Sequence, residues 1–277
     1  MPYVGPKLIT LLQFDNVLTF QEDLRRFPCR VIDLRDIRGT RLLCRSSSLR
    51  QIAKRLKGET GITFLGSGDF HYVSYLLLRR LKGAFSLILF DNHADLKPGY
   101  TYLACGSWLG FALKLPNLQK AFIIGAQEDG ISGINSRLLA KVVYVPYRQA
   151  ATSEKWHRFP NRLPPIREQG MQKTIRAVIS LVPTEAVYVS IDKDVLHEKE
   201  AFTNWEQGAM ELEELLTALK EIVRAKEVCG VDICGEMYPD PLGLFSPTAR
   251  KATVLNSLAN AKIIEAILGA QILKQAS

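Results

Sequence analysis

Short apolar runs rich in β-branched residues alternate along the chain with longer segments in which apolar residues recur at helical spacing. Such runs are typical of buried strands, and the amphipathic segments between them are typical of helices that cross over a parallel sheet. Strands are expected at residues 62–65, 86–90, 121–124, 142–145, 187–191 and 228–233. Helices are expected at residues 72–81, 103–113, 167–180, 211–224 and 247–268. The alternation predicts an α/β fold in three layers, α-β-α, with a mainly parallel sheet.

One segment interrupts this alternation. Residues 146–165 contain several prolines and a tryptophan without clear periodicity, and we interpret them as a long excursion rather than as a domain boundary. At 277 residues and 47% hydrophobic content, the chain is long enough to bury one large core. We therefore expect a single α/β domain over residues 1–277.

Composition narrows the possible partners. The net charge of +8 does not indicate nucleic-acid binding, because the basic residues are spread along the chain and no nucleic-acid motif accompanies them. The five cysteines are odd in number and form no Cys-x-x-Cys pair, which favours reduced thiols. The apolar stretch Leu8–Leu12 is too short for a secretion leader or a membrane span. We expect a cytoplasmic protein with a small-molecule substrate and no membrane or nucleic-acid partner.

Residue types that bind metals follow two of the predicted strands. They are Asp91, His93 and Asp95 after the second strand, and Asp192 and Asp194 after the fifth. Side chains two positions apart on extended backbone share a face, and ligands of α/β proteins bind beyond the carboxyl ends of parallel strands. Close carboxylates repel one another unless cations lie between them. The two clusters therefore favour two divalent ions that share bridging carboxylates.

A third strand end supplies a further imidazole. His71 follows Gly68-Asp69-Phe70 at the entrance to a helix, from which its side chain can reach the same edge of the sheet. With His71 the set contains two imidazoles and four carboxylates, and such an oxygen-rich set suits Mn²⁺ better than Zn²⁺. The alternative for each cluster is a polar strand end without an ion. The recurrence of such clusters in one chain favours a metal site.

Three motifs, in this order, resemble those of the arginase and agmatinase family, the ureohydrolases. They are Gly68-Asp69-Phe70-His71, Asp91-Asn92-His93-Ala94-Asp95 and Ser190-Ile191-Asp192-Lys193-Asp194. The resemblance runs from about Gly61 to the C-terminus and implies an arginase-like fold, a homo-oligomer and two bound manganese ions. The metal ligands that it implies are His71, Asp91, His93, Asp95, Asp192 and Asp194. A looser match at residues 232–239 implies that Glu236 faces the guanidinium group of a substrate.

The resemblance also implies a reaction. It is the hydrolysis of a non-peptide C–N bond in a small linear guanidino or amidino compound by a metal-bound hydroxide. Asp95 would both bind metal and accept a hydrogen bond from the nucleophile, and Glu236 would orient a cationic head group. The leaving amine needs a proton, for which the candidates are His197, His157 and solvent. We favour His197, because it follows Asp194 on the same loop.

The chain departs from the family around the substrate. Where many arginases and agmatinases carry a His-Gly pair, this sequence has Cys105-Gly106. We interpret Cys105 as a packing residue rather than a nucleophile, because nothing in the sequence places a base beside it. Gly235 is an extra residue before Glu236. Trp205 would either line the substrate pocket or anchor its own loop.

Two other functions are compatible with the sequence. A deacetylase-like amidohydrolase shares the arginase fold but uses one Zn²⁺, and the retention of all four aspartates argues against it. A non-catalytic protein that keeps metal ions for structure or ligand binding is favoured by the loss of the loop histidine. The substrate is left open, because the loops that discriminate among the family's substrates are replaced here.

Overall fold

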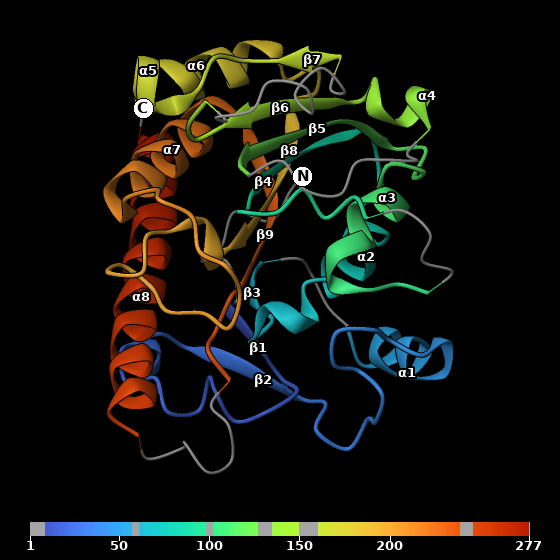
Figure 1. Ribbon diagram of the computed structural model, residues 1–277, viewed down its shortest axis with the longest axis vertical. Coiled ribbons are helices and arrows are strands. Elements are labelled where there is room, and N and C mark those ends of the chain that lie inside the picture. The colour runs from blue at the N-terminus through green and yellow to red at the C-terminus, as the bar shows by residue number, and fades with distance from the viewer. Residues whose placement is uncertain are drawn as a thin grey trace.

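A single sheet of parallel strands forms the centre of the protein (Figure 1). The computed structural model describes residues 9–56, 61–97, 102–126, 135–149, 160–238 and 246–276. Within these residues the strands are β1 (Ile9–Gln13), β2 (Cys29–Asp33), β3 (Ile62–Phe64), β4 (Phe85–Phe90), β5 (Leu118–Gly125), β6 (Val142–Pro146), β7 (Asn161–Arg162), β8 (Ala186–Asp192) and β9 (Glu227–Cys234). Their order is β2-β1-β3-β9-β8-β4-β5-β6-β7, and every neighbouring pair is parallel. The strands β3, β9, β8 and β4 are therefore neighbours, although they are far apart in sequence.

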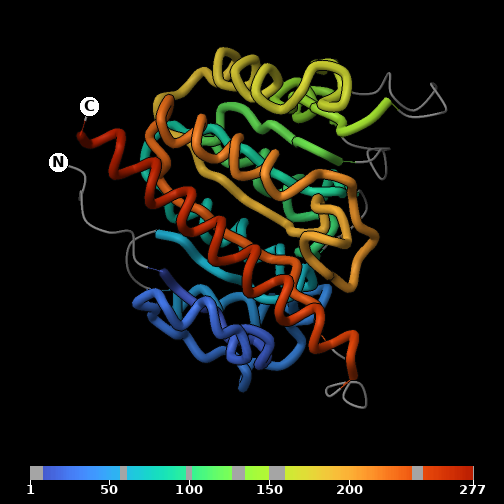
Figure 2. Tube along the Cα trace, turned by 90° about the vertical axis from the view of Figure 1, so that its left-hand side faces the viewer, coloured from blue at the N-terminus to red at the C-terminus, as the bar shows by residue number. Residues whose placement is uncertain are grey.

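Helices cover both faces of this sheet (Figures 1 and 2). They are α1 (Ser46–Arg55), α2 (Val73–Leu78), α3 (Trp108–Ala112), α4 (Ser136–Leu139), α5 (Ile166–Gln169), α6 (Met171–Leu181), α7 (Leu212–Ala225) and α8 (Pro247–Ala276). Short 3₁₀ turns are η1 (Asp23–Arg26), η2 (Gly68–Phe70), η3 (Cys105–Ser107) and η5 (Lys193–Val195). Helices α5 to α8 pack on one face, where Figure 2 shows α8 running beside α7, and α1 to α4 pack on the other.

The side chains of the central strand β4 alternate between two hydrophobic cores, one on each face of the sheet. Ile88 and Phe90 point into the core beneath α6, α7 and α8, whereas Leu87 and Leu89 point into the core beneath α2 and α3. All four side chains are fully buried. A strand that is covered on both faces is apolar at every position rather than at alternate ones. The predicted three-layer α/β fold is confirmed, and the sheet is parallel at every described pair.

The predicted strands and helices are confirmed, with differences at their ends. The helix expected at 167–180 is divided at Gly170, whose φ of +79° interrupts the helical backbone between α5 and α6. The last helix begins as expected, because the Ser246 hydroxyl accepts a hydrogen bond of 3.1 Å from the Ala249 amide. It continues beyond the expected end to Ala276. Strands β1, β2 and β7 were not expected, and the last of them lies within the excursion at 146–165.

All five cysteines are free thiols in the structure, as expected from their number and spacing. Among the described helices, none is both long enough and apolar enough to cross a lipid bilayer.

Candidate metal centre

A small cavity lies at the carboxyl ends of the central strands and has a volume of about 210 Å³. Its lining consists of Leu42, Leu43, Gly68, His71, Asp91, His93, Asp95, Lys97, Ala104, Cys105, Gly106, Asp192, Asp194 and Trp205. All six metal ligands predicted from the sequence are in this lining. The structure therefore brings together the side chains that follow β3, β4 and β8.

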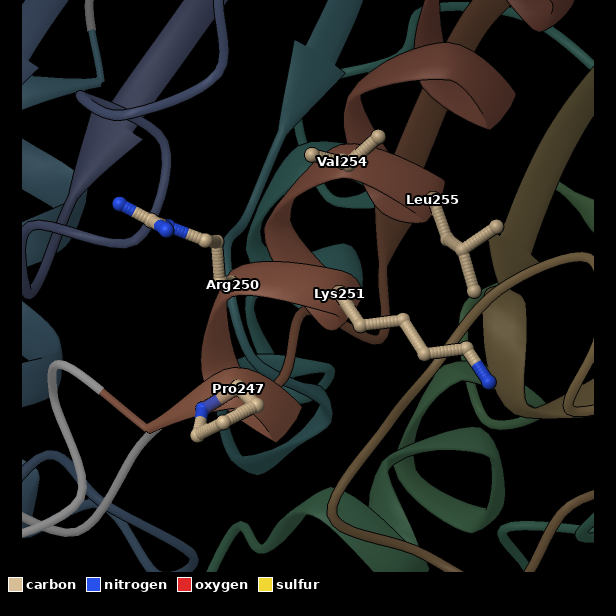
Figure 3. A pocket seen from close by; sticks show the side chains of 5 residues that line it. All are labelled: Pro247, Arg250, Lys251, Val254 and Leu255. Carbon is tan, nitrogen blue, oxygen red and sulfur yellow. The ribbon is translucent and has the colours of Figure 1, made fainter.

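A second hollow, at the start of α8, has different chemistry. Figure 3 shows its lining residues, which are Pro247, Arg250, Lys251, Val254 and Leu255. The side chains of Arg250 and Lys251 extend in different directions, and none of the five is an imidazole, thiol or carboxylate (Figure 3). This hollow lacks groups that bind metals, so the cavity at the strand ends is the candidate site.

His71 lies among three aspartates on one side of the cavity. Its Nδ1 atom is 3.1 Å from Asp95 Oδ2, 3.4 Å from Asp91 Oδ2 and 3.5 Å from Asp192 Oδ2. The turn η2 carries His71 over the sheet edge, and it passes so close to β8 that a Cβ atom on Gly68 would lie 3.0 Å from Asp192 Oδ2. Phe70, which separates Asp69 from His71, does not prevent His71 from reaching the cluster. These four side chains form one group of potential metal ligands.

The other nitrogen of His71 is held by a chain of hydrogen bonds. Nε2 lies 3.0 Å from the Ser190 hydroxyl, which donates a hydrogen bond of 2.6 Å to Asp232 Oδ1. Because the serine proton is used toward Asp232, Nε2 donates to Ser190, and Nδ1 is the nitrogen that faces the aspartates of the cavity. Metal-binding histidines in proteins are oriented in this way by hydrogen bonds from their second nitrogen.

His93 forms a second group on the other side of the cavity. Its Nδ1 atom is 2.8 Å from Asp194 Oδ2 and 3.7 Å from Asp91 Oδ1. The strands fix this arrangement, because β4 and β8 pair in a register that places Phe90 opposite Ile191, and Asp91 and Asp192 follow at the same level. Asp91 belongs to both groups. The structure thus contains two neighbouring groups of potential metal ligands that share a carboxylate.

Burial and neighbouring charges raise the pKa of several acidic and imidazole groups in this cluster. Burial, and after it the charge of neighbouring aspartates, raises the pKa of Asp91 well above its ordinary value, and Asp91 Oδ2 is a buried atom without a hydrogen-bond partner. Burial and Asp194 raise the pKa of Asp192 to about 6. Burial opposes the charged imidazoles, but Asp95 raises the pKa of His71 to about 9, and Asp194 does the same for His93. Side chains that hold protons so strongly are suited to bind divalent cations. The cations would replace the protons, and one of them would bond to the unpartnered Asp91 Oδ2 atom.

The metal-free protein is expected to lose stability as the pH rises. The pKa of Asp192 is raised from 3.8 to about 6, and those of His71 and His93 are raised from 6.5 to about 9. The folded chain therefore binds more protons than the unfolded chain between about pH 4 and 9, so the free energy of unfolding falls across that range. Melting temperatures of metal-free and metal-loaded protein at pH 6 and pH 9 test this. The stabilisation by metal should be larger at pH 9, and an equal or smaller effect there would contradict the assignment.

The carboxylate of Asp95 accepts a hydrogen bond from a buried tryptophan. The Trp108 indole donates a hydrogen bond of 2.5 Å to Asp95 Oδ2, the oxygen that also faces His71. Asp95 has a φ of +49°, a left-handed backbone conformation that is uncommon for residues other than glycine. These contacts orient the last carboxylate of the motif toward the same point as the others.

Glu236 lies elsewhere than the resemblance implies, and it is not among the described residues that line the cavity. Its carboxylate forms a buried ion pair with the Lys193 ammonium and accepts hydrogen bonds of 2.6 Å from Gln21 and 2.8 Å from Asn260. The extra Gly235 causes this. Its φ is +90°, and a Cβ atom there would lie 2.5 Å from an oxygen of Asp192, so only glycine fits and the chain turns Glu236 away from the cavity.

His197 also lies outside the cavity lining. It is half-buried on the loop after η5, where its Nδ1 atom accepts a hydrogen bond of 3.2 Å from the Lys199 amide. Replacing His197 with alanine is therefore expected to change kcat by less than about threefold, because proton donation requires contact with the leaving group. A loss of a hundredfold in steady-state kinetics would restore His197 as the proton donor. The other candidate, His157, lies outside the described residues.

Cys105 and Trp205 both line the cavity. Burial, followed by the negative charge of Asp95, raises the pKa of the Cys105 thiol to about 12, which agrees with its interpretation as a packing residue rather than a nucleophile. Trp205 packs against Gly68, and its ring lies edge-on to His93 with the centroids 6.1 Å apart. Its indole nitrogen is buried and has no hydrogen-bond partner.

Several residues of the site were not singled out from the sequence. Leu42 and Leu43 line the cavity from the first sixty residues, where no chemical pattern marks them. Trp108 gives no sequence signal either. Asp232 and Cys234 could have been found, because they alternate at the end of a predicted strand as Asp192 and Asp194 do.

Comparisons with other proteins agree with this geometry. The sequence model described as the Arginase family matches residues 11–241. An uncharacterized protein of Thermotoga maritima is 33% identical over 238 residues, which are 86% of this chain and 82% of that protein. The structure of formimidoylglutamase from Bacillus subtilis has a TM-score of 0.66 at 17% identity, covering 99% of this chain and 90% of that one. The structure of proclavaminate amidino hydrolase from Streptomyces clavuligerus has a TM-score of 0.62 at 14% identity, covering 96% of this chain and 93% of that one.

The match to the family model includes most of the first sixty residues, which the motifs alone leave outside the resemblance. The chain therefore belongs to the arginase family.

Proposed function

We propose that this protein hydrolyses a C–N bond in a small linear amidino compound with two divalent metal ions. The observation that carries the proposal is the pair of ligand groups that share Asp91 in a cavity of about 210 Å³. Membership of the arginase family, and a fold shared with an amidino hydrolase and a formimidoylglutamase, support this class of reaction. Two divalent ions at such a site supply an activated water and stabilise developing negative charge.

The two ligand groups would divide the ions between them. His71, Asp95 and Asp192 would hold one ion, His93 and Asp194 would hold the other, and Asp91 would be shared between them. Four carboxylates and two imidazoles favour Mn²⁺ as the ion supplied to this set. The hydrogen bonds that His71 donates to Ser190 and that Trp108 donates to Asp95 would keep these ligands in place when substrate enters.

The cavity supports a small substrate. Its volume of about 210 Å³ is below the range of roughly 300–1,000 Å³ that is usual for ligand pockets. Leu42 and Leu43 provide apolar contacts, and the unpartnered indole N–H of Trp205 provides a hydrogen-bond donor. Among the described lining residues, the only imidazoles are the two proposed ligands, so we propose that solvent protonates the leaving amine. Glu236 would then support the site through Lys193 rather than contact the substrate.

A substrate panel tests this proposal. Protein reconstituted with excess Mn²⁺ would be incubated with arginine, agmatine, 4-guanidinobutyrate and N-formiminoglutamate, and the release of urea, ammonia and formamide would be measured. Turnover of at least one compound is expected, and a chelator should abolish it. Two bound ions without any turnover would favour a non-catalytic binding protein. Hydrolysis of acetylated amines with one bound Zn²⁺ would favour the deacetylase-like function instead.

A further inference from the structure

A buried thiol lies beside the proposed metal ligands. Cys234 is the last residue of β9 and is the register partner of Asp192 on β8. Its Sγ atom is 3.1 Å from Asp192 Oδ2. The ligand atoms of Cys234, Asp192 and His71 all lie within 4.8 Å of one another, and the three residues are buried. The thiol is therefore close enough to His71 and Asp192 to bind the same ion. Cys234 is not among the residues that line the cavity.

The strand geometry directs this thiol to the cluster. Side chains alternate along β9, so Cys234 shares a face with Asp232, whereas Ile233 points into the opposite core. Asp232 is joined to His71 through Ser190, which places His71 and Cys234 on the same side of the sheet. The positive φ of Gly235 then turns the chain, so the strand delivers its last side chain at the level of the aspartates.

We propose that Cys234 is a ligand to the metal ion on the His71 side, so that this position has a mixed nitrogen, oxygen and sulfur set. The inference rests on the proposed dinuclear centre and goes beyond it. A thiol binds metal as the thiolate, so the ion replaces the thiol proton, which is released to solvent, and the hydrogen bond to Asp192 is lost. Thiolate ligands favour softer ions such as Co²⁺, Zn²⁺ and Fe²⁺ over Mn²⁺. The position beside His93 has no thiol among its described ligands, so the two positions should differ in metal preference.

The alternative role of Cys234 is a hydrogen-bond donor that only orients Asp192. A donor keeps its proton and makes no bond to metal, so cobalt would show no sulfur-to-metal charge transfer. A ligand gives an intense charge-transfer absorption in the near ultraviolet when Co²⁺ is bound. Serine at this position preserves a donor to Asp192 but removes the sulfur, which separates the two roles.

The experiment is cobalt spectroscopy of the full chain. Metal-free wild-type protein, Cys234→Ser and Cys105→Ser would be loaded with Co²⁺, the bound cobalt counted by elemental analysis, and the near-ultraviolet spectrum recorded. Cys105 is the matched control, because it is the thiol that lines the cavity from the other side. The inference expects the charge-transfer band in wild type and in Cys105→Ser, and its loss in Cys234→Ser with cobalt still bound.

Three results would overturn the inference. Wild-type protein that binds two cobalt ions without the band has no thiolate ligand, and this outcome leaves the proposed function standing. A band that persists in Cys234→Ser would assign the sulfur to another cysteine. If Cys234→Ser fails to fold, the absence of the band from folded wild-type protein would still overturn the inference. Wild-type protein that binds no cobalt at all would overturn both this inference and the proposed metal centre.

Discussion

Replacing Asp91 with asparagine is expected to lower kcat/KM by at least about a thousandfold and to reduce the bound metal below two ions per chain. Asp91 is the residue common to both ligand groups, and its buried Oδ2 atom has no hydrogen-bond partner. Asparagine has the same shape but lacks the negative charge and one acceptor oxygen. A dinuclear centre contributes several kcal/mol to a hydrolytic transition state, and each 1.4 kcal/mol is about tenfold in rate. Kinetics on the best substrate of the panel and elemental analysis would measure both effects.

An aspartate on the surface provides the control. Asp36 is exposed and pairs with Arg55, so Asp36→Asn should leave metal content and rate unchanged within about twofold, since exposed ion pairs contribute little. If Asp91→Asn kept two tightly bound ions and most of its activity, Asp91 would not bridge the centre.

Replacing Lys193 with methionine is expected to lower the free energy of unfolding by about 3–5 kcal/mol. The side chains of Lys193 and Glu236 are 0% and 2% exposed, and they form an ion pair beneath the ligand loop. Removing one partner leaves a buried charge without compensation, which is the costly case for such pairs. Gln21 and Asn260 still donate to the carboxylate, but neither carries a positive charge. Urea unfolding of the metal-loaded protein would measure the loss.

The double variant Lys193→Met with Glu236→Gln separates charge from packing. Because it removes both charges while nearly preserving volume, it should recover most of the lost stability. Equal losses in the single and double variants would show that packing, rather than the unpaired carboxylate, causes the effect. A single variant as stable as wild type would show that the pair contributes nothing.

The metal cluster could be predicted because strand ends obey simple geometry. Asp91 and Asp192 each end an apolar run, and in a parallel sheet such ends meet at one edge. His93 and Asp194 come with them, because Asp91 and Asp192 each accept a hydrogen bond from the amide two residues on, at His93 and Asp194. The rest of the strand order was not needed, because any arrangement that makes β4 and β8 neighbours gives this result. His71 was expected from its place at the entrance to a helix, and the family resemblance implies the same residue.

The surroundings of the cluster could not be predicted, because they depend on single backbone turns and on distant segments. One glycine with positive φ, Gly235, decides that Glu236 pairs with Lys193 instead of facing the cavity. His197 lies outside the cavity lining, which closeness in sequence to Asp194 does not reveal. Leu42 and Leu43 lie at the cavity beside Ala104 and Cys105, to which their backbone is bonded across a long separation in sequence.

The most direct test of the dinuclear centre is a crystal structure of the protein loaded with Mn²⁺, with anomalous diffraction measured at the manganese edge. Two peaks about 3.5–4 Å apart are expected, one beside His71 and one beside His93, with Asp91 bonded to both. A single manganese peak would contradict the account. The absence of any peak in the presence of excess Mn²⁺, with Asp91 bonded to no ion, would contradict it as well.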